Sequence, residues 1–427
     1  MSFKFVHTAD IHLDSPLKTL AARNPELGAY IHEASRISFS RIIDLCLEEQ
    51  VSALLISGDL YDSGQTSMKT ARFLVHEFMR LKEAGIRVFI IRGNHDAQSR
   101  ITRQLTFPDN VHVFGSRDDY ITLDDDLLPF PVVLHGVSFS KPHAPESLLP
   151  KYSPPVDGAF NIALLHTSLN GSSVHDPYAP CSEKELYEKD YDYWALGHIH
   201  QGFIHHIGSQ TIAMPGIPQG RDIGEEGKKS IILGTLHNDR TLDLKKVSVN
   251  PAEFMKINQS LEGVTEWRDM LTELTASIQE AAGKIHADAA IIRLELSGST
   301  PLAWQIRRDH DLLIHELMTI GEKFGNVFID KVLLTCEAPH MTRHETADAI
   351  IELRDYMDAM TTQSSPLMKD LTGLAGLLSS KLPPDMRDLF GKNEEEQTHH
   401  IQDWALEGIE DILAQLRLSP DEQNQDE

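Results

Sequence analysis

The first 250 residues alternate short, largely apolar runs with longer segments of helical periodicity. The apolar runs cover residues 3–8, 53–57, 88–91, 132–134, 162–165 and 193–196, and strand-like segments continue at 230–233 and 242–249. Such short apolar runs are typical of strands that are buried on both faces of a sheet, with helices such as 35–49 and 66–84 packed over them. The pattern predicts an α/β fold for residues 1–250.

Asn250 and Pro251 mark the predicted end of this first domain. Residues 251–341 repeat the alternation on a smaller scale, with strands near 253–257, 289–296 and 327–334 and helices at 264–282 and 303–319. Residues 342–427 are predicted to be helical, with helices near 343–360, 366–379 and 401–416. The predicted breaks are Pro366, Pro383-Pro384 and the run Glu394–Glu396, and the polar residues from about 419 onward are predicted to be disordered.

Polar clusters follow several of the apolar runs directly. Their members are Asp10 and His12, Asp59 and Asp62, Asn94, His95 and Asp96, His166, and His198 and His200. The carboxyl ends of strands are where α/β folds bind their ligands. The clusters are therefore candidates for one shared site.

Each cluster alone has an ordinary structural explanation, such as a surface loop, a capping turn or a packed histidine. Together they would bury many carboxylates and imidazoles, which is costly unless a metal ion satisfies them. His198 and His200 also face the same side of an extended segment, because side chains alternate along it. Imidazole and carboxylate ligands without thiolates favour Mn, Fe or Zn over Ca or Mg. The residues predict two ions that share one bridging carboxylate.

Composition narrows the class of protein. The three cysteines, Cys46, Cys181 and Cys336, form no C-x-x-C pair, which argues against a disulfide framework and a cysteine zinc site and favours a reducing cytoplasm. We expect no signal peptide and no membrane span, since no apolar run approaches ~18 residues. The net charge of −25 means that any affinity for DNA must come from metal ions, a local basic patch or a partner.

The ordered motifs D-x-H, G-D-x-x-D, G-N-H-D, H and G-H-x-H resemble those of the calcineurin-like metallophosphoesterase superfamily. The segments 8–14, 57–62 and 165–169 resemble the SbcD-type nucleases of DNA double-strand-break repair, and among them the bacterial branch called YhaO. The resemblance implies a four-layer α/β sandwich over residues 1–250, an α/β capping domain over 251–341 and a helical C-terminal region over 342–427.

The resemblance also implies a role for each residue of the motifs. One ion would be bound by Asp10, His12, Asp59 and His200, and the second by Asp59, Asn94, His166 and His198, with Asp59 bridging. His95 would face the scissile phosphate as proton donor, and Asp62 would orient His95. Two divalent ions, Mn²⁺ in the first place with Fe or Zn as alternatives, would activate water and neutralise charge on the phosphate.

The function implied is a metal-dependent DNA nuclease of double-strand-break repair, with exonuclease activity on duplex ends and endonuclease activity on single strands. Its implied partners are DNA, a second copy of the chain, and an SMC-like ATPase whose coiled coil docks on the C-terminal helices. The apolar stripe on those helices, formed by Trp404, Ile409, Ile412, Leu413 and Leu416, is equally explained by packing on the protein's own core.

Two other functions stay open: a phosphodiesterase or phosphatase for nucleotides or other small substrates, and a DNA-end-binding scaffold with weak catalysis. Weaker candidates for DNA phosphate contacts, for each of which ordinary solvated surface is as good an explanation, are Arg92, Arg100, Arg103, Arg221, Lys228 and Lys229. Residues 224–230 fail the spacing of a phosphate-binding loop, because Asp222 stands where its first glycine belongs.

Overall fold

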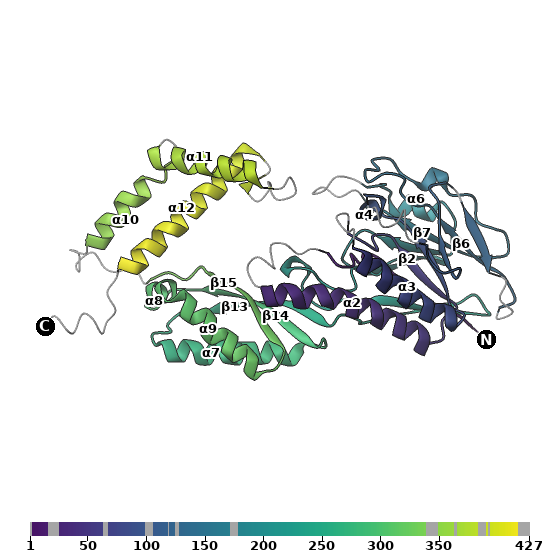
Figure 1. Cartoon of the computed structure of the whole chain (residues 1–427), viewed down its shortest axis with the longest axis horizontal. Coiled ribbons are helices and arrows are strands. Elements are labelled where there is room, and N and C mark those ends of the chain that lie inside the picture. Colours follow the sequence, from purple (N-terminus) through teal and green to yellow (C-terminus); the bar gives the residue numbers. More distant parts are fainter. Residues whose placement is uncertain are drawn as a thin grey trace. The chain divides into compact units, whose positions relative to one another are not determined.

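The structure is a computed structural model that describes most of the chain. The described residues are 2–15, 25–62, 67–98, 106–117, 119–123, 128–170, 178–338, 349–362, 365–382, 390–391 and 393–416. The chain divides into two compact units (Figure 1). The first unit comprises residues 1–256, 284–292 and 326–330, and the second comprises 257–283, 293–325 and 331–427.

The first unit contains a six-stranded sheet in the order β12-β11-β1-β2-β3-β4. Its strands are β1 (Ser2–Thr8), β2 (Ala53–Ser57), β3 (Arg87–Ile91), β4 (Val111–Val113), β11 (Ile231–His237) and β12 (Leu242–Val247). Strands β1 to β4 are parallel and in register, whereas β11 pairs antiparallel with both β1 and β12. The ends of β1, β2 and β3 therefore meet at one edge of this sheet.

A second six-stranded sheet of this unit has the order β5-β6-β7-β8-β10-β9. Its strands are β5 (Tyr120–Leu123), β6 (Val132–Gly136), β7 (Phe160–His166), β8 (Tyr193–Gly197), β9 (Phe203–Ile207) and β10 (Gln210–Met214). The four inner strands are parallel, and β5 and β9 form antiparallel edges.

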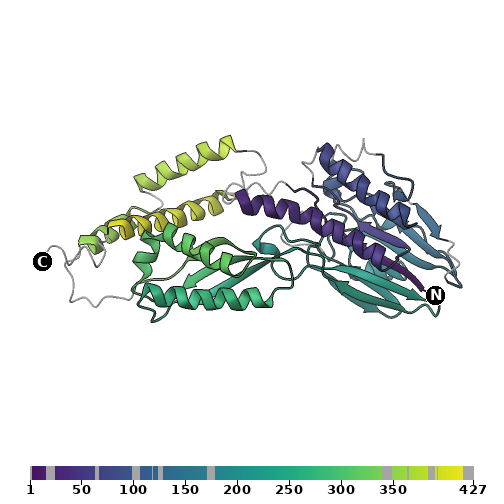
Figure 2. The same ribbon diagram turned by 60° about the horizontal axis from the view of Figure 1, so that its bottom comes forward.

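Alternating side chains build four layers in the first unit. Ala53 and Leu55 of β2 belong to the core between the two sheets, whereas Leu54 and Ile56 belong to the core under the helices. Helices α2 (Pro25–Glu48) and α3 (Met68–Glu83) lie side by side over that outer face (Figure 1 and Figure 2). The outer face of the second sheet is covered by short elements that include η1 (Leu149–Lys151) and α6 (Glu183–Tyr187). The four-layer α/β sandwich predicted from the sequence is confirmed.

Helix α2 begins ten residues before the predicted helix 35–49. Leu27, Ile31 and Ala34 share one buried face of this earlier part, at helical spacing, and pack in a cluster with Phe254 and Ile291. The sequence did not predict this earlier part of the helix, because Gly28 and the neighbouring polar residues interrupt its apolar pattern.

The remaining strands, β13 (Ala252–Ser260), β14 (Ala289–Ser297) and β15 (Val327–Leu334), form a three-stranded sheet. Their connections contain α7 (Trp267–Lys284), α8 (Ala303–Arg308) and α9 (His310–Lys323). The strands and α7 agree with the sequence expectation. The single helix predicted at 303–319 is two helices, interrupted at Asp309, whose carboxylate accepts hydrogen bonds from Arg308.

The described part of the C-terminal region contains α10 (Ala349–Ala359), α11 (Pro366–Lys381) and α12 (Glu394–Leu416), and α12 packs on α8, α10 and α11. Glu394–Glu396 were predicted to break the helical pattern, but they form the first turn of α12. Acidic residues stabilise a helix N-terminus, and the Asn393 side chain accepts the Glu396 N–H at 2.8 Å. The predicted break at 383–384 and the tail from 419 lie outside the described residues. No described helix has both the length and the apolar composition needed to cross a membrane.

Candidate metal centre

The predicted polar residues lie where strands of both sheets in the first unit end. Asp10 and His12 follow β1, Asp59 and Asp62 follow β2, and Asn94 and His95 begin helix α4 (Asn94–Gln98) after β3; His166 ends β7, and His198 and His200 follow β8. The site is therefore built by docking one sheet against the other.

Ligand-type atoms converge in three overlapping groups, each with its atoms within 4.8 Å of one another. The groups are Asp10, His12 and His200; Asp10, Asp59 and His166; and His12, Asp62 and His95. The two remaining residues join the same cluster. The ring centroid of His198 lies 5.1 Å from that of His166, and Asn94 Oδ1 lies 3.0 Å from His166 Nε2. The structure brings all nine predicted residues together.

Backbone hydrogen bonds fasten the loops to one another. Asp10 N–H donates to the Gly58 carbonyl at 3.0 Å, and His198 N–H donates to Asp10 Oδ2 at 2.8 Å. His95 N–H donates to Asp59 Oδ1 at 3.0 Å. A carboxylate of this cluster thus holds a neighbouring loop with one oxygen while its other oxygen remains for a ligand.

Four residues of the cluster adopt the left-handed backbone region: Asp10, His12, Asp59 and His198, with φ of 52°, 45°, 51° and 103°. Such conformations cost of order 1–3 kcal/mol each and persist where the surrounding structure over-determines them, as it does at functional sites. The strain is consistent with side-chain placement being maintained at the expense of local stability.

Glycines let the strand ends approach closely. A Cβ on Gly93 would lie 2.3 Å from Asp59 Oδ1, and one on Gly197 would lie 2.1 Å from the Ser57 carbonyl oxygen. A Cβ on Gly58 would lie 2.4 Å from His166 Nδ1. Glycine is needed at these three positions, because any side chain there would push the ligand-type residues apart.

Orphaned buried atoms test whether this cluster fits a cation. Asp10 is fully buried and His12 is 2% exposed, yet Asp10 Oδ1 and both ring nitrogens of His12 have no hydrogen-bond partner among the described residues. Buried polar groups are nearly always hydrogen-bonded. A cation between these residues would satisfy the carboxylate oxygen and one imidazole nitrogen, so the residues fit a metal ion.

His166 gives a second, independent indication. Its Nδ1 lies 2.9 Å from the Ser57 carbonyl, which only accepts, so Nδ1 carries the hydrogen. Its Nε2 then faces two further oxygens, Asn94 Oδ1 at 3.0 Å and Asp59 Oδ2 at 3.3 Å. Burial lowers the pKa of His166, but the Asp59 carboxylate outweighs burial and raises it to about 9. This point between one nitrogen and two oxygens requires positive charge, whether a proton or a metal ion. The N/O donor set fits Mn, Fe or Zn.

His95 is held by Asp62 at the exposed side of the cluster. Its Nδ1 lies 2.9 Å from Asp62 Oδ1, and Ser15 Oγ donates to the other Asp62 oxygen at 2.7 Å. Burial would lower the pKa of His95, but the hydrogen bond and the charges of Asp62 and Asp59 leave that pKa above its ordinary value. The ring is about one third exposed, which lets a substrate reach it.

No role was predicted for Asp96, the last residue of the G-N-H-D motif. Its carboxylate accepts backbone N–H groups from Gly93 at 3.0 Å, Tyr61 at 3.0 Å and Leu60 at 3.3 Å. Burial and then the Asp59 charge raise the pKa of Asp96 to about 6. Asp96 therefore ties the loop after β2 to the loop after β3.

Two further contacts were missed because they join distant segments. Asp14, which is buried, accepts two hydrogen bonds of 2.6 Å from Arg36 of α2 and a third from Thr70 of α3. Glu225 Oε1 lies 2.5 Å from His200 Nδ1. No motif spacing in the sequence indicates either contact. Among the weaker candidates, Arg221 lies beside His200, whereas Arg100 and Arg103 are outside the described residues.

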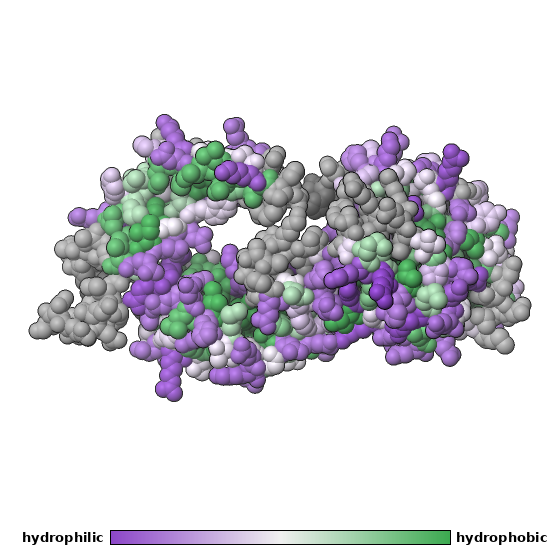
Figure 3. All heavy atoms as spheres, viewed as in Figure 1, coloured by the Kyte–Doolittle hydropathy of each residue, from purple (hydrophilic) through white to green (hydrophobic). Residues whose placement is uncertain are grey.

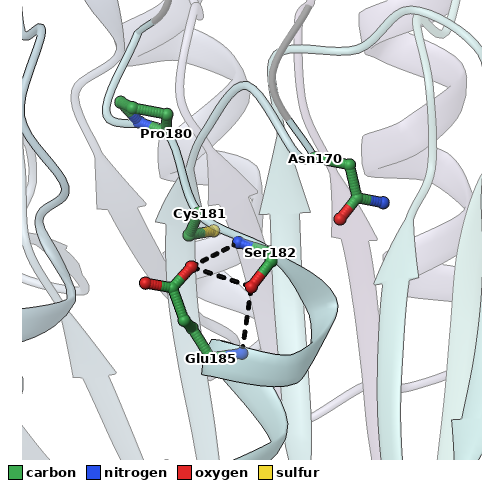
Figure 4. Close-up of a pocket in the computed structure, with 5 residues that line it drawn as sticks. All are labelled: Asn170, Pro180, Cys181, Ser182 and Glu185. Atoms are coloured by element: carbon green, nitrogen blue, oxygen red, sulfur yellow. Dashed lines mark hydrogen bonds between the residues drawn. The ribbon is translucent and has the colours of Figure 1, made fainter.

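A separate surface hollow is lined by Asn170, Pro180, Cys181, Ser182 and Glu185 (Figure 4). Its polar groups are engaged with one another: Glu185 accepts from the Ser182 N–H and hydroxyl, which caps α6. Burial raises the pKa of the Cys181 thiol to about 11, so this thiol is not an activated nucleophile. The hollow contains none of the clustered residues.

Comparison with known proteins gives two family matches. The model of the calcineurin-like phosphoesterase family matches residues 3–202, and that of the middle domain of the metallophosphoesterase YhaO matches residues 254–337. The uncharacterized metallophosphoesterase YhaO of Bacillus subtilis is 32% identical over 305 residues, which cover 70% of this chain and 72% of that protein.

DNA double-strand break repair proteins Mre11 are similar at lower identity. The protein of Methanocaldococcus jannaschii is 26% identical over 60% of this chain and 69% of its own length. That of Thermoplasma acidophilum is 22% identical, but the match covers 86% of this chain and 96% of that protein.

Proposed function

Because this chain belongs to the calcineurin-like metallophosphoesterases, in their YhaO branch, and is a metal-dependent phosphoesterase, we propose that it is a DNA nuclease that hydrolyses phosphodiester bonds with two bound cations. The observation that carries this proposal is the cluster itself: ligand-type atoms of Asp10, Asp59 and three histidines converge next to a partly exposed His95 that Asp62 holds. The similarity to Mre11 proteins supports DNA as the substrate, because it extends beyond the domain that contains the cluster.

The proposed ligands of one cation are Asp10, His12, Asp59 and His200, and those of the other are Asp59, Asn94, His166 and His198. Bound divalent cations, with Mn²⁺ proposed first, supply a water of lowered pKa and neutralise charge on the phosphate. The chain's own contribution is orientation. Ser57 fixes the tautomer of His166, and Glu225 fixes that of His200, so that each ring directs a nitrogen lone pair into the cluster.

His95 is the proposed proton donor. Its Nδ1–H is held by Asp62, so Nε2 is the ring nitrogen that gives a proton to the leaving sugar oxygen as water adds to phosphorus and the P–O bond breaks. The raised pKa of His95 keeps the ring protonated closer to neutral pH than an ordinary histidine.

The C-terminal helices support a proposed protein partner, an SMC-like ATPase. Ile409 and Leu413 of the predicted stripe are buried, whereas Trp404, Ile412 and Leu416 are exposed. Helix α11 adds exposed Leu374, Leu377 and Leu378, and apolar side chains gather over α10–α12 in Figure 3. Two residues of the stripe thus pack internally, while the other three stay available to a partner. A homodimer is also proposed, and light scattering after gel filtration of the purified chain tests it.

The proposal is tested by digestion of end-labelled duplex and single-stranded DNA at low salt with Mn²⁺, with EDTA as the metal-free arm. His95→Ala removes the proton donor, and His76→Ala, an exposed histidine on α3, is the matched control. We expect metal-dependent shortening of DNA that His95→Ala abolishes and His76→Ala preserves.

A chromogenic phosphodiester in the same reactions separates the alternatives. Hydrolysis of this ester with intact DNA would refute the nuclease proposal in favour of a small-substrate phosphodiesterase. DNA binding without hydrolysis of either substrate would refute it in favour of a DNA-end scaffold.

A further inference from the structure

One carboxylate, that of Glu225, contacts two functional groups at the edge of the cluster. Glu225 ends the short helix η2 (Ile223–Glu225) between β10 and β11. Its Oε1 lies 2.5 Å from His200 Nδ1 and 3.3 Å from Arg221 Nη2, and its Oε2 accepts the Arg221 backbone N–H at 2.7 Å. The side chain of Glu225 is only 13% exposed, so these contacts are shielded from water.

The contact to His200 fixes which ring nitrogen is free. An ionised carboxylate only accepts hydrogen bonds, so His200 Nδ1 carries the hydrogen and Nε2 keeps its lone pair. His200 is also one of the residues whose ligand atom lies within 4.8 Å of those of Asp10 and His12. A histidine oriented in this way by a carboxylate is a stronger and better-placed metal ligand.

The contact to Arg221 leaves part of the guanidinium unused. Arg221 Nε is buried and makes no hydrogen bond within the described part of the chain. Arg221 lines one hollow with Ser15, His32 and His12, and His12 is one of the proposed metal ligands. A guanidinium that is fixed by one ion pair and retains a free donor is suited to an additional oxyanion.

The negative charges of the cluster explain why the positive charge of Arg221 would help a substrate to bind. Asp10, Asp59 and Asp62 all lie in the cluster, and a phosphoester that approaches them carries the same sign of charge. The Arg221 charge lies close to the cluster, since Arg221 lines one hollow with His12 and its Nη2 lies 3.5 Å from His200 Nδ1. A phosphate oxygen near His12 would therefore meet a fixed positive charge.

We propose that Glu225 is a positioning residue that holds His200 for a metal ion and Arg221 for a phosphate oxygen of the substrate. Cation binding and phosphoester binding then share one carboxylate, although His200 and Arg221 act on different ligands. The inference rests on the proposed phosphoester chemistry but not on DNA as the particular substrate.

The test uses purified full-length chains of Glu225→Gln and Arg221→Ala. Glu226→Gln changes the exposed neighbouring carboxylate, and Arg72→Ala removes an exposed arginine from α3, so each variant has a matched control. Circular dichroism first establishes that every variant is folded. Calorimetry then measures Mn²⁺ binding without substrate, and inorganic phosphate binding to the Mn²⁺-loaded proteins.

We expect Glu225→Gln to bind Mn²⁺ about 10–100-fold more weakly, the usual effect of losing a carboxylate behind a histidine ligand. Phosphate binding by Glu225→Gln should weaken as well. Arg221→Ala should bind phosphate about 10–100-fold more weakly and raise the KM of a chromogenic phosphodiester, with Mn²⁺ affinity unchanged. Both controls should match the wild type, and Arg221→Lys should recover part of the phosphate affinity.

Wild-type Mn²⁺ affinity in Glu225→Gln, or wild-type phosphate affinity in Arg221→Ala, would overturn the inference. A wild-type protein that binds Mn²⁺ but neither phosphate nor the diester would instead refute the phosphoester function and, with it, the role of Arg221. In that case Mn²⁺ binding by Glu225→Gln would still decide whether Glu225 positions His200. A protein that cleaves only the small diester would refute the nuclease proposal and leave the inference standing.

Discussion

Replacing Gly197 by alanine would place a Cβ between the two sheets at the strand ends that carry the cluster. This atom would lie 2.1 Å from the Ser57 carbonyl oxygen, 2.9 Å from Ala9 Cβ and 3.0 Å from His166 Nδ1. Carbon and carbonyl oxygen atoms in contact keep about 3.3 Å apart, so β2 and β8 would have to separate by about 1 Å. The backbone conformation of Gly197 is not left-handed, so the whole effect comes from space.

The consequences follow from what these strands carry. Gly197 precedes His198, and Ser57 precedes the loop with Asp59. Overpacking of this kind costs about 1–3 kcal/mol, and each kcal/mol lowers the Tm of a domain of this size by about 2–4 °C. A displacement of ~1 Å in reacting groups lowers turnover about 10²-fold. We therefore expect a modest loss of stability and a large loss of activity.

Three measurements test this prediction: thermal unfolding, calorimetric titration with Mn²⁺, and hydrolysis of a chromogenic phosphodiester. The matched control is Gly283→Ala on α7, where a Cβ meets nothing within 4 Å. Alanine there should leave activity unchanged and raise stability by up to about 1 kcal/mol. If Gly197→Ala keeps both Mn²⁺ affinity and turnover, close approach of the strands does not set the geometry of the cluster.

Three further predictions concern single side chains. Asp59→Asn should abolish both hydrolysis and calorimetric Mn²⁺ binding, because Asp59 belongs to both proposed cation sites; retained binding of two ions would contradict the bridging role. His95→Gln should keep Mn²⁺ affinity but slow diester hydrolysis by about 10²–10⁴-fold, the usual contribution of a general acid, and an unchanged rate would exclude that role. Asp14→Asn should destabilise the protein by about 1.5–3 kcal/mol at pH 7, measured by urea unfolding. Burial would raise the pKa of Asp14, but hydrogen bonds from Arg36 and Thr70 leave it below its usual value. The stabilisation is therefore present above about pH 4 and lost as pH falls through the folded pKa, so a variant effect that does not shrink in acid would contradict this ion pair.

The sequence predicted the parts of the fold whose signals are local. Apolar runs such as 53–57 and 88–91 are strands at or within one residue of the predicted bounds, because burial on both faces leaves few polar positions in the strand. The order of strands was not predictable. β11 lies between β12 and β1, a pairing that depends on residues at opposite ends of the first unit.

The candidate site likewise contains some residues that the sequence predicted and others that it did not. The nine motif residues were predicted because each cluster directly follows a strand, so one rule about strand ends places them together. Glu225 and Arg36 were not, because each belongs to another element and contacts the cluster or its loop only through tertiary structure. The role of Gly197, the first residue of the G-H-x-H motif, was not predicted, since nothing in a sequence reveals that a Cβ would meet the Ser57 carbonyl.

The antiparallel pairing of β1 with β11 has a consequence for biosynthesis. Ser2 pairs with His237, so the edge of β1 has no partner until the ribosome has made nearly all of the first unit. At 5–20 residues per second this takes about 10–50 s, during which an unpaired edge can recruit other chains. The cluster also needs His198 and His200, which emerge late in the same interval. Cation uptake therefore cannot assist the early nascent chain, because the proposed ligands are complete only after His200 has been made.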